Sequence, residues 1–153
     1  MFRNLLLPVD GSELSMKAAY HGIDLAKAVG GSVVAFFARV PPDSIYTVEY
    51  VPMDPLMLEK HDKHQLDTAG HIFAKLRIKA QASGVSISTA SEVSNDIASM
   101  ISKVAKEHKC DLIVIGSHGR GALGRMFMGG VAVRLLSDTI LPVLVYRTAN
   151  KSE

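Results

Sequence analysis

The stretch 111-DLIVIGSHGRGALGRMFMGG-130 joins the apolar run 111–115 to a loop with six glycines in fifteen residues. Such a continuous apolar run is typical of a strand buried on both faces of a parallel sheet. Glycine loses more backbone freedom on folding than any other residue, so a loop with this many glycines is costly to order unless its backbone conformation or a close contact requires them. We therefore expect the loop to leave the end of a buried strand and its backbone to approach something closely.

Four further apolar runs predict the other strands: 4-NLLLPV-9, 33-VVAFFARV-40, 85-VSIST-89 and 143-VLVY-146. All except the run at 85–89 are nearly continuous in Val, Leu, Ile and Phe. The run at 85–89 alternates between apolar and polar residues, and this alternation predicts an edge strand with one solvated face.

The segments between these apolar runs have the periodicity of amphipathic helices. A first helix follows Ser12 as its N-cap, and a third begins at Ser94 or Asn95. A short fourth helix follows Gly129 and Gly130. The four stripes are Leu14, Ala18, Leu25 and Val29; Leu66, Ala69, Phe73, Leu76 and Ala80; Ile97, Ile101, Val104 and Ala105; and Val131, Leu135 and Leu136. The alternation of strands and helices predicts an α/β sandwich with right-handed crossovers. The long connection 41–62 contains four prolines and is predicted to be a loop.

Composition narrows the class of protein. The chain has 153 residues, 48% of them hydrophobic and 21% charged, which fits one soluble globular domain. No apolar run approaches the ~18 residues that span a bilayer, so no membrane association is expected. The net charge is +2 and no basic stripe is present, so nucleic acid is not an expected partner. The single cysteine, Cys110, fits a buried, inert thiol in the reducing cytoplasm.

Two predicted strand ends carry unusual chemistry. Ligands of open α/β sheets bind at the carboxyl ends of strands, where the strand order reverses. The first strand ends in 8-PVDGS-12, and the fourth ends in the glycine loop. The order 3-2-1-4-5 would make these ends neighbours, although periodicity does not fix that order. The loop leads into a helix N-terminus, which attracts phosphate. The alternative is that the glycines only form turns.

Other motifs are weaker. The string 119-GRGALG-124 has glycine spacing typical of dinucleotide-binding loops, but too little chain follows it for that βαβ unit. No Walker A string is present. His64, Asp67 and His71 lie on a predicted exposed helix face without a fourth ligand, so no metal site is expected.

The spaced glycines and two further blocks resemble the universal stress protein family. Its motif is G-x2-G-x9-G-(S/T), and Gly116, Gly119 and Gly129 keep that spacing with Gly130 in the last place. The blocks 5-LLLPVDGSELS-15 and 142-PVLVY-146 are also similar to the family. The resemblance runs from Phe2 to about Arg147. Residues 1–147 are expected to form one nucleotide-binding domain, with 148–153 as a polar C-terminal tail.

The resemblance implies a three-layer sandwich: a five-stranded parallel sheet of order 3-2-1-4-5 with helices on both faces. It also implies binding of ATP or AMP, with Mg²⁺ as a possible companion of ATP. Asp10 would hydrogen-bond the ribose, and the backbone of Val40 would meet the adenine edge. The remaining expected site residues are Pro8 and Val9 at the base, Ile115 and Gly116 under the ribose, Gly119, Gly129 and Gly130 at the phosphates, and Val131 in that wall. Arg120 or Arg125 would compensate for the hydroxyl that Gly130 lacks.

The predicted function is that of an adenine-nucleotide-binding stress-response or regulatory protein. A homodimer is expected through the last strand, Val143 to Arg147, because a bare apolar edge invites pairing. No enzymatic activity beyond weak ATP hydrolysis is expected. One alternative is an interaction module that uses no nucleotide. The other is an adenylyl-transferase or ATP pyrophosphatase, although the strings H-x-G-H and S-G-G-x-D-S are absent.

Overall fold

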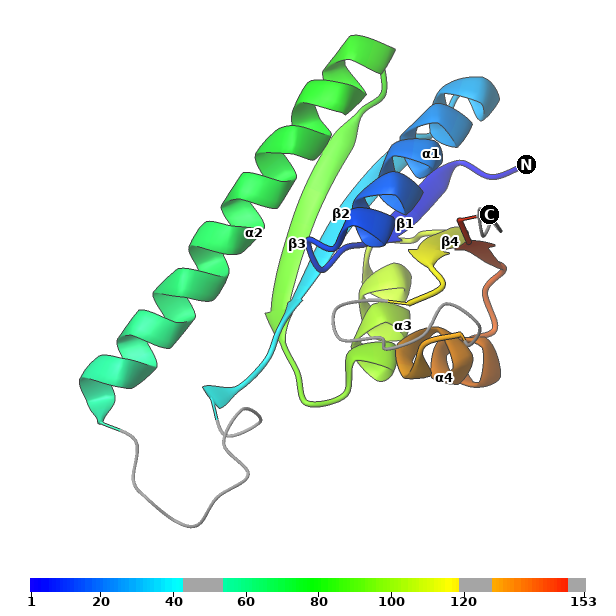
Figure 1. Ribbon diagram of the computed structural model, residues 1–153. Helices are drawn as coiled ribbons and strands as arrows, with labels where there is room; N and C mark the ends of the chain where they lie inside the picture. Colours follow the sequence, from blue (N-terminus) through cyan, green and yellow to red (C-terminus); the bar gives the residue numbers. More distant parts are fainter. Residues whose placement is uncertain (43–53, 119–127, 149–153) are drawn as a thin grey trace, which may run out of the picture.

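Five parallel strands form one sheet of order β3-β2-β1-β4-β5 in a computed structural model that describes residues 1–42, 54–118 and 128–148. The strands are β1 (Asn4–Pro8), β2 (Ser32–Arg39), β3 (Ile87–Val93), β4 (Leu112–Gly116) and β5 (Val143–Tyr146). The helices are α1 (Glu13–Val29), α2 (Pro55–Ser83), α3 (Ile97–Glu107) and α4 (Gly130–Asp138). The α/β class predicted from the alternation of strands and helices is confirmed, as is the strand order that the family resemblance implies (Figure 1).

The helices cover both faces of the sheet (Figure 1). Neighbouring residues of a strand point to opposite faces. In β1, Leu5 and Leu7 pack with α1 and α2, whereas Leu6 packs with α3 and α4. All three leucines are fully buried. Because β1, β2 and β4 are buried on both faces, their sequences are continuously apolar rather than alternating.

Glycines and polar caps end the helices where the sequence predicts turns. Ser12 is the N-cap of α1 and accepts a hydrogen bond from the Ser15 N–H. Gly30 ends α1 with φ 66°, a left-handed conformation that favours glycine. The third helix differs from its prediction, since its N-cap is Asp96 rather than Ser94 or Asn95. The Ser94 hydroxyl instead accepts a hydrogen bond from the Asp96 N–H, which places the cap two residues later.

The edge strand β3 lies later in the chain than predicted. Its position at the edge is confirmed, but it spans Ile87–Val93 rather than 85–89. The pairing with β2 runs from Val33–Ile87 to Arg39–Val93, so the partner strand determines the extent. Val85 is buried just before the strand, where its N–H bonds to Ala80 at the end of α2.

The second helix corrects two predictions. It begins at Pro55, with Asp54 as its N-cap, so residues 55–62 are helix rather than loop. Leu66, assigned to the buried stripe, is 50% exposed, whereas Gln65 is 9% exposed. The buried face of α2 therefore includes the polar residue Gln65, four positions before Ala69. The sequence prediction chose Leu66 instead because it placed only apolar residues on the buried face.

Candidate nucleotide site

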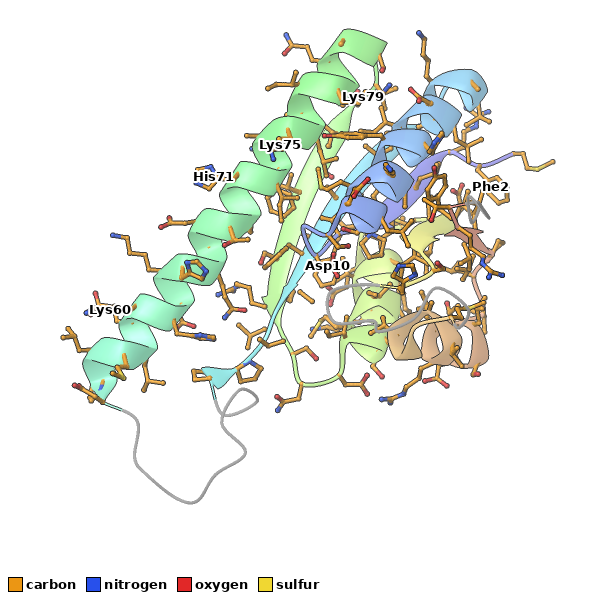
Figure 2. All side chains as sticks on the ribbon, in the orientation of Figure 1. Phe2, Asp10, Lys60, His71, Lys75 and Lys79 are labelled. Carbon is orange, nitrogen blue, oxygen red and sulfur yellow. The ribbon has the colours of Figure 1, made fainter. Side chains whose placement is uncertain are left out.

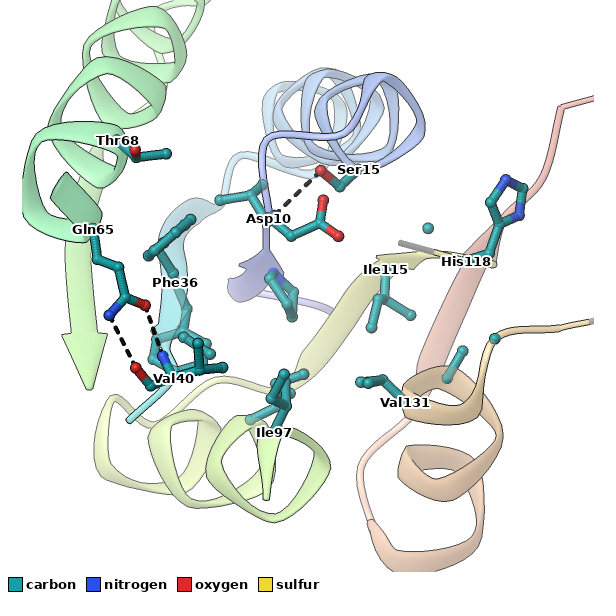
Figure 3. Close-up of a pocket in the computed structure, with 18 of the residues that line it drawn as sticks. Asp10, Ser15, Phe36, Val40, Gln65, Thr68, Ile97, Ile115, His118 and Val131 are labelled. Carbon is teal, nitrogen blue, oxygen red and sulfur yellow. Dashed lines mark hydrogen bonds between the residues drawn. The ribbon is translucent and has the colours of Figure 1, made fainter. Parts of the chain in front are cut away.

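A crevice of about 690 Å³ opens at the carboxyl ends of β1, β2 and β4 (Figure 3). The strand order reverses here, because β1 pairs with β2 on one side and with β4 on the other. Its volume is within the range of small-molecule sites. The crevice is lined by Pro8, Val9, Asp10, Ser15, Phe36, Phe37, Ala38, Val40, His61, His64, Gln65, Thr68, Ile97, Ile101, Ile115, Gly116, His118, Gly129, Gly130, Val131 and Ala132.

The end of β1 holds a carboxylate at the crevice. Val9 continues the ladder, since its N–H donates to the Phe36 carbonyl at 2.8 Å. Asp10 then turns the chain into α1: its Oδ1 accepts from the Ser12 N–H at 2.9 Å. The following Gly11 has φ 82°, which favours glycine. This turn holds the Asp10 side chain in the loop between β1 and α1 (Figure 2), where it borders the crevice (Figure 3).

The end of β4 and the start of α4 form the opposite wall. Ile115, Gly116 and His118 approach it from β4, and Gly129, Gly130 and Val131 from α4. Gly130, Val131 and Ala132 occupy the first turn, where N–H groups have no intrahelical acceptor. These donors, at the positive end of the helix dipole, suit an anion.

The two α4 glycines differ in the space around them. A Cβ on Gly129 would lie 3.1 Å from the Cα of His118, and the Gly129 N–H donates to the Ser117 carbonyl at 2.6 Å. A Cβ on Gly130 would meet no atom within 4 Å. Gly129 is the N-cap, so Gly130 is the first helical residue. A Cβ at 129 would therefore be packed tightly against the backbone of His118, whereas open space surrounds 130.

Part of the predicted site lies outside the described residues. Gly119, Arg120 and Arg125 belong to the segment 119–127, so their roles stay predictions. The described members of the predicted site all line the crevice: Pro8, Val9, Asp10, Val40, Ile115, Gly116, Gly129, Gly130 and Val131.

The end of β2 is occupied by a side chain that sequence reasoning missed. The Val40 N–H donates to Gln65 Oε1 at 2.8 Å, and Gln65 Nε2 donates to the Val40 carbonyl at 2.9 Å. His61 Nε2 lies 2.8 Å from Gln65 Nε2 and 3.1 Å from the Val40 carbonyl. The signal available in the sequence was a glutamine four residues before Ala69, on a helical stripe that is otherwise apolar.

Two groups weighed in the sequence do not belong to the predicted nucleotide contacts, although His64 also lines the crevice. His64, Asp67 and His71 are exposed, and among the described residues no three His, Cys, Asp or Glu side chains gather as a metal site. Cys110 is buried, and burial, followed by the nearby Asp111 charge, raises the pKa of its thiol to about 11. The described helices include none long and apolar enough to cross a bilayer.

A family model, a curated relative and a solved structure that match the chain all come from the same family. The model of the universal stress protein family matches residues 1–147. The universal stress protein MJ0531 of Methanocaldococcus jannaschii is 30% identical to the chain, over 99% of this chain and 85% of that protein. The solved structure of the universal stress protein UspA from Lactobacillus plantarum has a TM-score of 0.80 at 22% identity, covering 95% of this chain and 98% of that one.

Two similar structures contain adenine nucleotides. One is a universal stress protein in complex with cAMP, with a TM-score of 0.66, 19% identity and coverage of 97% of this chain and 98% of that one. The other is the universal stress protein from Archaeoglobus fulgidus in complex with dAMP. Its TM-score is 0.60 at 16% identity, covering 95% of this chain and 97% of that one. At these identities the likeness establishes a shared fold.

Proposed function

This chain belongs to the universal stress protein family, and from that premise we propose that its crevice binds an adenine nucleotide. The nucleotide, ATP or AMP, acts as a regulatory ligand in a cytoplasmic stress-response protein. Mg²⁺ accompanies ATP where the triphosphate is bound.

The observation that carries the proposal is the meeting of three kinds of group in one crevice. Asp10 supplies a carboxylate at the end of β1, and a carboxylate accepts well from two ribose hydroxyls. The first turn of α4 supplies N–H donors suited to phosphate. Val40 supplies a backbone donor and acceptor at the end of β2, suited to the edge of a base. These segments are distant in sequence and converge only in the fold.

The apolar part of the crevice supports a base rather than a free phosphate. Phe36, Ile97 and Ile115 line it together with Val40 and Asp10 (Figure 3). A purine needs an apolar slot with polar groups at its edge, as small-molecule sites generally provide. The cAMP and dAMP complexes of similar proteins make adenine the favoured base.

A ligand role, rather than catalysis, is proposed because the described polar contacts of His61 and His118 at the crevice are with Gln65, Val40 and Ser117, none of which is a carboxylate. Asp10 lies on the β1 side and donates no proton while it is ionised. His61 lies beside Gln65, at the base end of the crevice. The regulatory unit is proposed to be a homodimer that pairs the β5 edges.

The test is to identify the ligand that co-purifies with the protein. Protein is purified without added nucleotide and denatured, and the released small molecules are identified by mass spectrometry. ATP and AMP are then titrated into ligand-free protein by calorimetry, with and without Mg²⁺. We expect adenine nucleotide in the released fraction and saturable binding on titration. An empty fraction together with no binding heat at millimolar nucleotide would instead favour an interaction module.

A further inference from the structure

The Gln65 side chain occupies the hydrogen-bonding groups of Val40 (Figure 3). Both contacts, 2.8 and 2.9 Å, are within the normal range for N–H···O bonds. Reversing the amide would bring its NH₂ against the Val40 N–H, two donors facing each other, so the orientation is determined by the backbone. With 9% of its surface exposed, Gln65 lies within the wall of the crevice.

A carboxamide carries the same pattern as one edge of adenine. Its oxygen accepts and its adjacent NH₂ donates, as do N1 and the N6 amino group of adenine. The Val40 N–H has one hydrogen and therefore serves one acceptor well. While Gln65 Oε1 holds it, adenine N1 cannot accept from it.

Accordingly, we propose that Gln65 is a built-in competitor of the base: adenine binds by displacing the Gln65 carboxamide from Val40. This inference rests on the proposed function and adds how the site controls its affinity. The long side chain of Gln65 can leave Val40 by rotation about its own bonds, with the α2 backbone in place.

His61 supports the occupied state. Its Nε2 lies 2.8 Å from Gln65 Nε2, and because an amide nitrogen only donates, this ring nitrogen accepts from Gln65 in the tautomer that carries its proton on Nδ1. The Val40 carbonyl, 3.1 Å from the same ring nitrogen, then accepts from Gln65 and not from His61. The two polar atoms of Gln65 are thus both satisfied without ligand. His61 and Gln65 are one helical turn apart on α2, so the helix itself fixes their spacing.

The test compares ATP affinity by calorimetry in the wild type, Gln65→Ala, Gln65→Met and Gln81→Ala. Removing the competing pair of hydrogen bonds should tighten ATP binding about tenfold in Gln65→Ala. Gln65→Met keeps the bulk and loses both bonds, so it should also tighten binding and guards against a folding defect of the alanine variant. Gln81 is exposed on the same helix, and Gln81→Ala should match the wild type.

A second measurement follows the displacement directly. The chain has two glutamines, Gln65 and Gln81, so their side-chain NH₂ signals in ¹⁵N spectra are assignable by loss in each variant. Without ligand, the Gln65 protons should exchange with water more slowly than those of Gln81. Saturation with ATP should bring the Gln65 exchange rate close to that of Gln81.

The possible outcomes separate the two proposals. If the wild type binds ATP and Gln65→Ala and Gln65→Met bind equally or more weakly, Gln65 does not compete and the inference is overturned while the proposed function stands. Slow Gln65 exchange in the ATP complex would overturn it as well. If no variant binds any adenine nucleotide, both proposals fall.

Discussion

At the scale of single residues, Asp10 is the side chain whose charge matters most to the proposed site. It turns β1 into α1 by accepting from the Ser12 N–H, and it borders the crevice. Asp10→Ala is expected to weaken ATP binding about tenfold or more, because hydrogen bonds to charged groups are the stronger kind. Asp10→Asn keeps an acceptor for Ser12 and serves as the control for the turn. Calorimetry giving the same affinity for the wild type and the alanine variant would remove Asp10 from the site.

At Gly130, in contrast, a substitution is expected to increase the affinity for ATP. Open space surrounds a Cβ at this position, and the residue opens α4 beside the crevice. Gly130→Ser adds a hydroxyl donor next to the first-turn N–H groups. ATP binding should tighten roughly three- to tenfold, the equivalent of one net hydrogen bond.

Gly129→Ala is the matched comparison for that variant. Its Cβ would press on the Cα of His118 at 3.1 Å, so its thermal unfolding temperature should fall. An unchanged ATP affinity in a folded Gly130→Ser protein would argue that the α4 glycines serve only the turn.

Side-chain identity in the sequence predicts some of these roles and not others. Asp10 stood out as a carboxylate after a buried strand, and the structure places it at the crevice. Gly129 and Gly130 look alike in sequence, and only their neighbours distinguish them: the chain passes close to one and not to the other. Gln65 was missed because hydrophobic periodicity predicts only apolar residues to be buried. Gln65 is buried because its side chain hydrogen-bonds the backbone of Val40, a contact that the sequence pattern does not reveal.

At the scale of elements, Asp96 joins the two helices on one face of the sheet. As N-cap of α3 it accepts from the Ser99 N–H at 3.2 Å and the Ser99 hydroxyl at 2.9 Å, and Arg134 of α4 donates to it at 2.6 Å. The hydrogen bonds from Ser99, followed by the Arg134 charge, hold the pKa of this carboxyl below its ordinary value of 3.8. The ionised cap therefore stabilises α3 above about pH 3.8, and that stabilisation is lost as the pH falls through the lowered pKa.

Asp96→Ala should therefore unfold at a lower temperature than the wild type at pH 7, and the difference should shrink at pH 3. Circular dichroism melts at the two pH values measure it. Asp96→Asn keeps a capping oxygen without the charge, so it should lose less at pH 7 and show a weaker pH dependence. A difference between the wild type and the alanine variant that is equal at both pH values would assign the effect to something other than the carboxylate.

Elements were easier to predict by type than by boundary. Continuous apolar runs identify β1, β2 and β4 because both faces of those strands are buried. They identify β5 as well, although no residue of β5 is buried and Leu144 is 40% exposed. The edge strand β3 extends to Val93 only because β2 continues alongside it, and that pairing is not visible locally. Residues 55–62 look like loop because prolines precede and begin them, yet Pro55 fits the first helical position.

At the scale of the whole molecule, the proposed dimer depends on the outer edge of β5. The carbonyls of Pro142 and Tyr146 accept from Ile113 and Ser117. Groups two residues apart in a strand point the same way, so Leu144 also faces β4 and the N–H of Val145 faces outward. A proline at 144 would damage the sheet itself, and position 145 is the proper place to test the edge.

Val145→Pro should therefore convert a dimer into a monomer, because proline cannot donate across the edge. Val145→Ala trims the same side chain and keeps the N–H, so it should remain dimeric. Light scattering after gel filtration at micromolar concentration measures both masses. A monomeric wild type, or a dimer that survives in Val145→Pro, would count against pairing through β5.

The order of the strands was the property of the whole molecule that local patterns left open. Alternating strands and helices predict a parallel sheet, but several orders satisfy that alternation. The resemblance to a family chose 3-2-1-4-5, and the structure confirms it. The central place of β1 rests on pairings with segments far along the chain, as in Leu6 with Val34 and with Ile113.

This central strand is also the first one made, which has a cost during synthesis. The Asp111 carboxylate that accepts from the backbone of Arg3 and Asn4 lies 108 and 107 residues later in the chain. At about 5–20 residues per second, β1 waits roughly 5–20 seconds on the ribosome for β4. During that time its apolar edge is open to any other nascent strand. A ribosome that stalls before Leu112 would thus hold a chain with β1, β2 and β3 but without β4 and β5. In that chain β1 is an unpaired apolar edge, which favours aggregation.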